Sequence, residues 1–312
     1  MVLGTAPAAV LAFDVGGTDI KAGLVDHHGR VLAVRRVPTP LDPTRPGEVV
    51  IERLADLANE LTTKYPEAPA KAAGIIVPGI VETEKGIGVY SANLRWRNFP
   101  FVAAAEKCLR LPVAFDHDVR SAAAVEHRFG GSRQFNEVVV IIVGTGIAAA
   151  VFSDGKAITA GGFAGELGHA MVPDPDAAPG TRRSTVLEAV GSAGAIAKRY
   201  TAQSGSPVTG AKAVLNKAQS GDDIAARVWH DAMDALAFTI CQCVNIIGTE
   251  AVVIGGGLAE AGEELLLEPL RRRVDSILDF HRRPQIIKAQ LGQDAGLLGA
   301  ALNARALLER TP

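Results

Sequence analysis

Cysteine is scarce in this sequence of 312 residues. Only three occur, Cys108, Cys241 and Cys243. An odd and sparse count is typical of a protein from a reducing cytoplasm and excludes a disulfide framework. Cys241 and Cys243 lie two residues apart in an apolar segment with helical spacing. That spacing points them to different faces and predicts core packing. We therefore expect a cytoplasmic protein.

Long apolar runs and an excess of one charge are also missing. No run reaches the roughly 18 residues of a membrane span. The N-terminal segment MVLGTAPAAVLAF has no basic region of the kind that begins a signal peptide. The formal net charge is −2, which favours neither nucleic acid nor a membrane surface. The two dense basic spots, Arg271–Arg273 and Arg282–Arg283, are interpreted as solvated helix faces.

Neither of two common nucleotide-binding signatures is satisfied by this sequence. No G-x-x-x-x-G-K-[ST] segment occurs, so a P-loop NTPase is disfavoured. Residues 144–149 (GTGIAA) satisfy a loose G-x-G-x-x-A dinucleotide pattern. A Rossmann turn must open a helix, whereas this segment continues into an apolar strand and then a turn at 153–156. A dinucleotide-dependent dehydrogenase is therefore disfavoured as well.

The sequence instead begins with a strand, a glycine turn and a second strand. An apolar run at 10–13 delivers Asp14 and then Gly16, Gly17 and Thr18, and a further apolar segment follows at 20–25. Glycines let the backbone approach a ligand, and consecutive N–H groups in such a turn can hold an anion. An ordinary glycine hairpin explains this segment equally well when it is considered alone.

The same unit occurs a second time. The strand predicted at 137–143 leads into Gly144, Thr145 and Gly146, and another strand follows at 147–152. A third apolar strand, at 251–254, ends in Gly255, Gly256 and Gly257. An internal repeat of this kind outweighs any single short motif.

Hydrophobic periodicity between these units predicts further helices and strands. Apolar residues make up 48% and charged residues 21% of the chain, enough for a packed core in one large or two ordinary domains. The segment 161–180 is rich in glycine, proline and aspartate and is expected to be a loop. Strands are expected at 31–37, 72–77 and 113–115, and helices at 48–65, 101–109, 119–129, 187–200, 224–247, 258–270, 263–278 (overlapping the one before it) and 296–308.

A set of short motifs in a fixed order extends over nearly the whole chain. No single motif is specific, but the combination resembles the ROK family of sugar kinases, repressors and related proteins. The motifs are Asp14–Thr18, Val77–Gly79, Asn93–Trp96, Asp116–Asp118, Gly144–Gly146, Gly165–His169 and Gly255–Gly257.

The resemblance implies an α/β fold, the two-domain actin-like ATPase (ribonuclease H-like) fold with a cleft between the domains. We expect a smaller domain at 1–117 plus about 296–312, onto which the C-terminal helix packs back, and a larger one at 118–295. ATP would be bound by the three glycine segments, and Asp14 would help to place Mg²⁺ through water. The ATP contacts implied are Gly16, Gly17, Thr18, Gly144, Thr145, Gly146, Gly255, Gly256 and Gly257.

Asp118 is the candidate general base. It lies at a predicted strand end just before a helix, where the helix N-terminus stabilises a carboxylate. An ionised aspartate can accept the proton of a hydroxyl that attacks a γ-phosphorus. The competing interpretation is a helix N-cap with a structural role only, and the family pattern favours the base. The family's usual pair here is Asn-Asp, and this chain has His117 in place of the asparagine.

The segment Gly165–His169 resembles the family's sugar-binding and zinc motif. In most relatives the histidine is a zinc ligand together with three cysteines in a C-x-C-G-x-x-G-C run, which is missing here. Structural zinc needs four ligands and the sequence supplies only His169, so we expect no zinc.

Several polar residues match sugar contacts of the family. Trp96 matches an aromatic position of the same motifs and is equally consistent with a core residue. The sugar contacts implied are Gly79, Asn93, His117, Glu166, His169 and Glu188.

The expected activity is phosphorylation of a hydroxyl of a hexose-like sugar, with glucose as the default acceptor and ATP as the donor. A kinase for a sugar-like cyclitol or modified sugar of secondary metabolism is the alternative, because His117 and the missing zinc run alter the pocket. A sugar-responsive repressor is disfavoured because the first strand begins near Val10 and leaves no room for a DNA-binding helix-turn-helix. A non-catalytic sugar-binding regulator is less favoured because Asp14 and Asp118 are present. We expect a homodimer with a small-molecule ligand and no nucleic-acid or membrane partner.

Overall fold

The structure is a computed structural model that describes residues 1–178 and 180–310. The chain divides into two compact units. Unit 1 comprises Met1–Phe129, Thr159–Phe163 and the chain from Gln293 onward, and unit 2 comprises Gly130–Ile158 and Ala164–Gly292.

Unit 1 is built on a five-stranded mixed sheet of order β3-β2-β1-β4-β8. Strands β1, β2 and β3 are antiparallel neighbours, whereas β4 is parallel to β1 and β8 is parallel to β4. The predicted strand–glycine turn–strand unit is confirmed by the β1–β2 hairpin. The strands are β1 (Ala9–Val15), β2 (Asp19–Val25), β3 (Val31–Pro38), β4 (Ala70–Val77) and β8 (Val113–His117).

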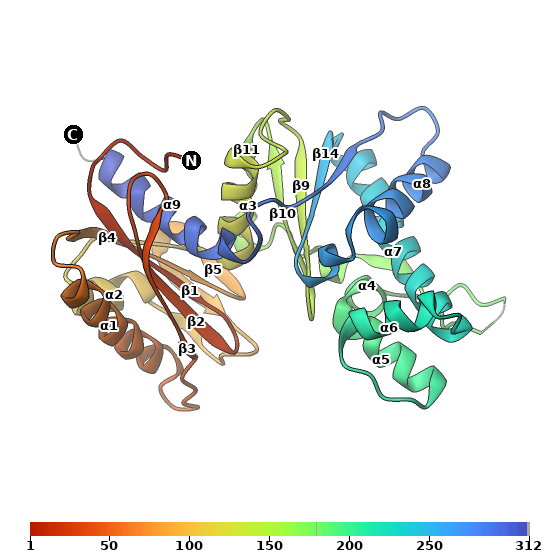
Figure 1. The fold of residues 1–312 in the computed structure, drawn as a ribbon, viewed down its shortest axis with the longest axis horizontal. Coiled ribbons are helices and arrows are strands. Elements are labelled where there is room, and N and C mark those ends of the chain that lie inside the picture. Colours follow the sequence, from red (N-terminus) through yellow and green to blue (C-terminus); the bar gives the residue numbers. More distant parts are fainter. Residues whose placement is uncertain (179, 311–312) are drawn as a thin grey trace. The chain divides into compact units, whose positions relative to one another are not determined.

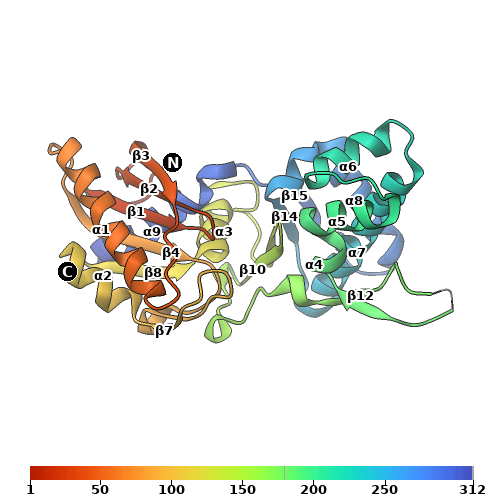
Figure 2. The same cartoon turned by 90° about the horizontal axis from the view of Figure 1, so that it is seen from below.

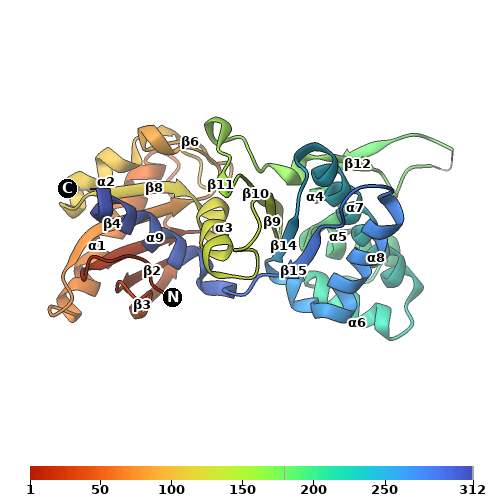
Figure 3. The ribbon, with the colours of Figure 1, turned by 90° about the horizontal axis from the view of Figure 1, so that it is seen from above.

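Helices pack against this sheet. The apolar side chains of α1 (Pro46–Lys64) and α2 (Phe101–Leu109) join those of the strands in one buried cluster. The C-terminal helix α9 (Ala295–Arg310) lies along β1 and β4, as Figure 1 and Figure 3 show, and α3 (Asp118–Phe129) packs on α9. A Cβ on Gly74 of β4 would overlap the Ala300 carbonyl, so only glycine allows α9 to come this close. Helix α9 thus packs within unit 1, where the sequence placed the C-terminal helix.

A small antiparallel sheet that the sequence did not predict completes unit 1. It is formed by β5 (Ile80–Glu82), β6 (Ile87–Tyr90) and β7 (Arg97–Phe99), with the 3₁₀ turn η1 (Thr83–Lys85) between the first two. The short turn η2 (Ala160–Gly162) packs on β5. These strands are only three or four residues long, too short for periodicity to reveal them.

Unit 2 repeats the topology of unit 1. Its sheet has the order β11-β10-β9-β14-β15, again with two antiparallel pairings followed by two parallel ones. The internal repeat seen in the sequence is therefore a repeat of fold. The strands are β9 (Val138–Val143), β10 (Ile147–Ser153), β11 (Lys156–Ala157), β14 (Ala251–Gly255) and β15 (Gln285–Lys288).

The helices of unit 2 gather around α7 (Asp223–Ile247), whose buried side chains include Cys241 and Cys243. The predicted core packing of both cysteines is confirmed. The expected helix at 187–200 is divided, because the backbone of Ser192 is extended and its side chain caps the second helix. The remaining helices are α4 (Glu188–Gly191), α5 (Ala193–Ser204), α6 (Gly210–Gln219) and α8 (Glu268–Ile277).

Two expectations for unit 2 need correction. The helices expected at 258–270 and 263–278 are replaced by a 3₁₀ turn η4 (Gly257–Ala261), a π turn η5 (Glu263–Leu267) and the shorter α8, because Gly262 has φ +80° and interrupts the first turn. The segment 161–180, expected to be a loop, contains η3 (Leu167–His169) and the strand β12 (Met171–Pro173), which pairs with β13 (Ser184–Val186). Pro179 of that expected loop lies outside the described residues.

The observed boundary between the units also differs from the expected one. The division expected after His117 precedes α3, whereas α3 packs on α9 and so belongs to unit 1. The Asn303 side chain of α9 donates to the Ser121 hydroxyl of α3 at 2.9 Å, which fixes this packing. In the part of the chain that the structure describes, no helix is long and apolar enough to cross a membrane.

Candidate active site

The glycine turn between β1 and β2 is held at its base by the end of β3. Gly16 donates its N–H to the Asp19 carbonyl at 2.8 Å and closes the turn. The Thr39 hydroxyl donates to the Gly16 carbonyl at 2.7 Å, and the Thr39 N–H donates to the Thr18 carbonyl at 2.8 Å. Gly17 and Thr18 are exposed. The turn is thus fixed at its base and open at its tip, as an anion-binding turn must be.

Asp14 lies near the end of β1, with its carboxylate against the first turn of α9. A Cβ on Gly296 of α9 would overlap the Asp14 Oδ2 atom. Burial and then the charge of Asp118 raise the pKa of Asp14 from 3.8 to about 6, while Lys21 and Arg36 oppose the rise. A carboxylate whose charge is this costly gains strongly from a nearby cation.

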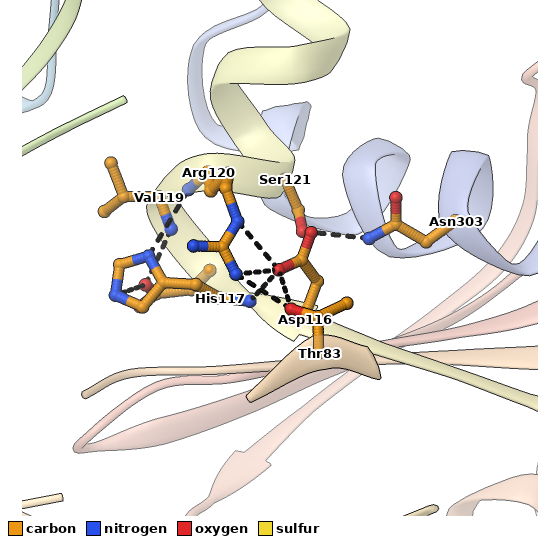
Figure 4. Close-up of polar contacts among 8 residues, drawn as sticks. Thr83, Asp116, His117, Val119, Arg120, Ser121 and Asn303 are labelled. Carbon is orange, nitrogen blue, oxygen red and sulfur yellow. Dashed lines mark hydrogen bonds and ion pairs between the residues drawn. The ribbon is translucent and has the colours of Figure 1, made fainter. Parts of the chain in front are cut away.

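Strand β8 delivers His117 and Asp118 to the start of α3. The His117 Nδ1 atom accepts the Arg120 N–H at 3.4 Å and so caps the helix. Because Nδ1 accepts, the neutral ring carries its proton on Nε2, which lies 3.3 Å from Asp118 Oδ1. The same Oδ1 accepts the Val119 N–H at 2.6 Å (Figure 4). The Val119 N–H and the nearby imidazole therefore restrain the Asp118 carboxylate, and the side chain still has 26% of its surface exposed.

This arrangement bears on the two interpretations of Asp118 raised by the sequence, and the role of the residue stays a prediction. The capping interaction with the first turn of α3 comes from His117. Asp118 instead bonds only the N–H of its immediate neighbour among its described contacts with the α3 backbone. Its carboxylate is therefore available to a reacting hydroxyl, as a general base requires.

A buried arginine that the sequence analysis missed supports this junction. Arg120 is 5% exposed and donates from Nε to Asp116 Oδ1 at 2.9 Å and from Nη2 to the Thr83 hydroxyl at 2.9 Å. The Thr83 hydroxyl in turn donates to Asp116 Oδ1 at 2.9 Å (Figure 4). The cluster joins β8, α3 and the small sheet. The only signal in the sequence was the four-residue spacing of Asp116 and Arg120, which is meaningful within a helix but not at a strand end.

The other sugar candidates of unit 1 differ in position. Asn93 is exposed, and a Cβ on Gly17 would lie 3.7 Å from its side chain, so the asparagine faces the glycine turn. Gly79 has φ +103°, and a Cβ there would overlap the Tyr90 carbonyl, so the residue shapes a close turn after β4. Trp96 is 1% exposed and packs edge-to-face on Phe101 with ring centroids 4.9 Å apart. Trp96 is a core residue.

The second glycine turn, between β9 and β10, is backed by the start of α5. Gly144 donates its N–H to the Gly146 carbonyl at 2.9 Å, and its own carbonyl accepts the Ala193 N–H at 2.9 Å. A Cβ on Gly194 would lie only 2.7 Å from the Thr145 carbonyl. The turn and the helix start are therefore in direct contact, which fixes the turn.

Glu188 links this turn to the Gly165–His169 segment. Its Oε2 atom accepts the Ile147 N–H at 2.7 Å. A Cβ on Gly146 would overlap the same oxygen, and one on Gly168 would approach it to 3.3 Å. Glu166 and His169 are exposed. The structure therefore brings Glu188 to the glycine turn as well as to the predicted sugar segment, a role as a brace that the sequence did not reveal.

The third glycine segment lies beside the second. Strand β14 pairs in parallel with β9, and Gly255 of β14 lies opposite Ile142 of β9. Gly256 has φ +81°, and a Cβ there would overlap the Val143 carbonyl just before the Gly144 turn. Two of the three predicted phosphate-binding segments are thus adjacent within unit 2.

Across residues 1–178 and 180–310, no group of three or more His, Cys, Asp or Glu side chains is placed to hold a metal ion. His169 is therefore not part of such a group. The absence of zinc stays a prediction that elemental analysis can test.

Comparison with known proteins gives a match over nearly the full length. Residues 10–306 match the model of the ROK family. The glucokinase of Thermotoga maritima is 34% identical over 311 residues, which cover 94% of this chain and 96% of that protein. The N-acetylmannosamine kinase of Escherichia fergusonii is 32% identical over 305 residues, covering 95% and 98%. The crystal structure of a ROK family glucokinase from Streptomyces griseus in complex with glucose and AMPPNP matches with a TM-score of 0.77 at 27% identity, covering 96% of this chain and 100% of that one. The predicted actin-like ATPase fold is confirmed by this match.

Proposed function

The chain belongs to the ROK family, and on that premise we propose that it is an ATP-dependent kinase that phosphorylates a hydroxyl of a hexose-like sugar. Its relatives named above are sugar kinases, and one of them is known in complex with glucose and a non-hydrolysable ATP analogue. The kinase class is supported by these relatives, whereas the roles of individual residues are proposed from their positions.

The observation that carries the proposal is the meeting of two carboxylates at one edge of the unit 1 sheet. Asp14 and Asp118 come at the carboxyl ends of β1 and β8, which run parallel on either side of β4. The negative charge of Asp118 repels that of Asp14 and contributes to the raised pKa of Asp14. Two carboxylates in different surroundings are suited to two different tasks. We assign cation placement to Asp14 and proton abstraction to Asp118.

The proposed reaction is a direct phosphoryl transfer. Asp118 accepts the proton of the sugar hydroxyl while the hydroxyl oxygen bonds to the γ-phosphorus and the bond from that phosphorus to the β–γ bridging oxygen breaks, releasing ADP. The Nε2–H of His117 and the N–H of Val119 keep the Asp118 carboxylate in one orientation. Most of the acceleration in such a transfer comes from positioning and charge neutralisation.

The donor set of unit 1 fits a magnesium ion. Mg²⁺ is usually held by one or two carboxylates together with substrate phosphates and waters, and Asp14 supplies one carboxylate next to the Gly16–Thr18 turn. When bound, Mg²⁺ would neutralise charge on the phosphates. Asp14 would hold it, directly or through water.

Unit 2 supplies the remaining proposed contacts. The glycine segments at 144–146 and 255–257 are adjacent and would bind the nucleotide phosphates through their backbones. The exposed Glu166 and His169 would bind sugar hydroxyls. Glu188 would hold the Gly144–Gly146 turn by accepting the Ile147 N–H, and its carboxylate would also contact the sugar.

A substrate screen tests the proposal directly. Purified protein with ATP and Mg²⁺ is assayed for ADP release on glucose, N-acetylmannosamine, other hexoses, and cyclitols such as inositol. A kcat/KM of about 10⁴ M⁻¹s⁻¹ or more on glucose is the range of a dedicated enzyme, and phosphorus NMR of the product identifies the hydroxyl. A much lower value with a cyclitol turning over faster would replace glucose by the alternative acceptor and keep the kinase. No ADP release on any polyol would refute the activity.

A further inference from the structure

A single buried arginine joins three elements of unit 2. Arg199 of α5 is 8% exposed. Its Nε and Nη2 atoms donate to the two oxygens of Asp176 at 2.8 and 2.9 Å, and Nη2 also donates to Asp231 Oδ2 at 2.8 Å. Asp231 belongs to α7, and Asp176 to the connection between β12 and β13. Forked pairing of a guanidinium with a carboxylate fixes orientation as well as distance.

The hairpin held by this arginine connects two proposed sugar contacts. Strand β12 begins two residues after His169, and β13 ends two residues before Glu188. The Leu187 N–H donates to the Ala170 carbonyl at 2.8 Å and closes the base of the hairpin. The hairpin lies beside α4 and α7 in both Figure 2 and Figure 3. A movement of the hairpin would therefore displace both His169 and Glu188, which flank it in the chain.

The same ion pair forms a wall of a cavity that reaches the Gly144–Gly146 turn. The cavity has a volume of about 590 Å³ and is lined by Thr145 and Glu188 as well as by Asp176 and Arg199. The Gln203 side chain donates to Asp176 Oδ1 at 2.9 Å and strengthens this wall. The hydrogen bond from Arg199 keeps the pKa of Asp176 below its usual value, so the carboxylate is charged at neutral pH.

We propose that the Asp176–Arg199 ion pair is a clamp that positions His169 and Glu188 for the sugar. In this proposal, a salt bridge between side chains holds the β12–β13 hairpin, which connects the two residues, in a single conformation. The inference rests on the proposed sugar-kinase function. An exposed ion pair contributes little to order; here Asp176 is half-exposed, but the arginine is buried and bonds both of its carboxylate oxygens. Asp176 and Arg199 are positioning residues and do not themselves touch the reacting atoms.

The structure offers a matched pair of variants. In Asp176→Ala, Arg199 keeps Asp231 as a partner, so the buried charge stays paired and only the tie to the hairpin is lost. In Asp231→Ala, the tie to the hairpin stays and only the tie between α5 and α7 is lost. Arg183→Ala is a second control, because Arg183 pairs with Asp174 on the same hairpin at 3.2 Å but its side chain is 73% exposed. Arg199 itself is left intact, since its removal would leave two carboxylates facing each other.

The first readout is hydrogen exchange, which does not depend on kinase activity. In Asp176→Ala, amides of 170–178 and 183–187 should exchange about tenfold faster or more, as expected when a local structure opens more readily. Asp231→Ala and Arg183→Ala should leave their exchange within about twofold of wild type. Unchanged exchange in Asp176→Ala would overturn the clamp.

The second readout separates sugar binding from nucleotide binding. Asp176→Ala should raise the KM for the sugar about tenfold or more, because small displacements of positioning groups are costly, with the KM for ATP nearly unchanged. Asp176→Glu should restore part of the sugar affinity. Faster exchange without a change in sugar KM would overturn the link between the hairpin and the sugar. Faster exchange in a protein that phosphorylates no sugar would keep the clamp and refute the proposed function instead.

Discussion

The imidazole Nε2 of His117 lies 3.3 Å from the Oδ1 of Asp118, and the Nδ1 of the same ring accepts the N–H of Arg120. One side chain thus caps α3 and restrains the proposed base. The family motif carries asparagine at this position. An asparagine also offers one acceptor and a pair of donors, so a histidine with its proton on Nε2 can take over both interactions.

Two replacements of His117 should show whether activity depends on these two interactions or on the imidazole ring itself. His117→Asn keeps an acceptor for α3 and a donor for Asp118, and should retain turnover within about fivefold of wild type. His117→Ala removes both, and a lost hydrogen bond worth about 1–3 kcal/mol corresponds to a 5- to 150-fold loss. Steady-state kinetics should place this loss in kcat more than in the KM for ATP. Equal turnover of the alanine variant and wild type would contradict the role, and His230→Ala, at an exposed position of α7, controls for loss of a histidine.

Asp118→Asn should abolish most of the phosphoryl transfer and spare the fold. The amide still accepts the Val119 N–H, but it no longer takes up a proton. A positioned base contributes about 10²–10⁴-fold, so turnover should fall by at least a hundredfold, with melting temperature and nucleotide binding close to wild type. Retention of more than about a tenth of the activity would exclude this role. Asp116→Asn is the contrasting variant, because Asp116 pairs with the buried Arg120 and its loss should lower stability.

Asp14→Asn should stabilise the ligand-free protein at alkaline pH and inactivate it. The pKa of Asp14 in the folded protein is about 6, above the ordinary 3.8. The folded state therefore binds the proton more tightly than the unfolded state, and this contribution to stability is full below pH 3.8 and is lost as pH rises through about 6. At pH 8 the ionised carboxylate costs up to about 3 kcal/mol, which the amide removes.

Urea unfolding at two pH values measures this effect. The stabilisation by Asp14→Asn should be present at pH 8 and much smaller near pH 4, while the exposed Asp279→Asn should show no such difference. A destabilised Asp14→Asn variant at pH 8 would mean that the charge is satisfied in the folded protein. Loss of magnesium-dependent turnover in the same variant tests the assignment of Asp14 to the cation.

Zinc should be absent from the purified, untagged protein. Elemental analysis should find well under one zinc ion per chain, and EDTA should leave the melting temperature unchanged, because the cysteine run that supplies zinc ligands in relatives is missing. His169→Ala should lower sugar affinity without lowering the melting temperature. Stoichiometric zinc, or a melting temperature that falls on chelation, would show that other side chains complete a site.

The main elements of the fold could be predicted from the sequence because they are long and strongly patterned. Strand β9 is continuously apolar, and α7 is a 25-residue amphipathic helix, so local periodicity was sufficient. The short strands β5, β6 and β7 gave no such signal. Helix α4 was merged with α5 because Ser192 is an ordinary polar residue in sequence and an extended cap only in the folded chain.

The candidate site was predictable as a set of motifs but not as a set of contacts. The glycine turns and Asp118 stand out because particular backbone shapes and charges need particular residues. The burial of Asp14, the capping by His117 and the brace formed by Glu188 each involve partners that come from other elements. Such contacts depend on how strands and helices pack, and no local pattern encodes them.

The sequence by itself determined the two repeated strand–turn–strand units, the glycines at their turns and the carboxylates at their strand ends. These are local properties, set by side-chain volume, backbone freedom and polarity at each position. Only the tertiary structure decided that α3 belongs with α9, that Arg120 links Asp116 to Thr83, and that Arg199 pairs with Asp176 between β12 and β13. Each of these three relationships is formed by residues from different elements. The two arginines need their carboxylate partners because both are buried, and the partners meet only after the elements that carry them have packed together.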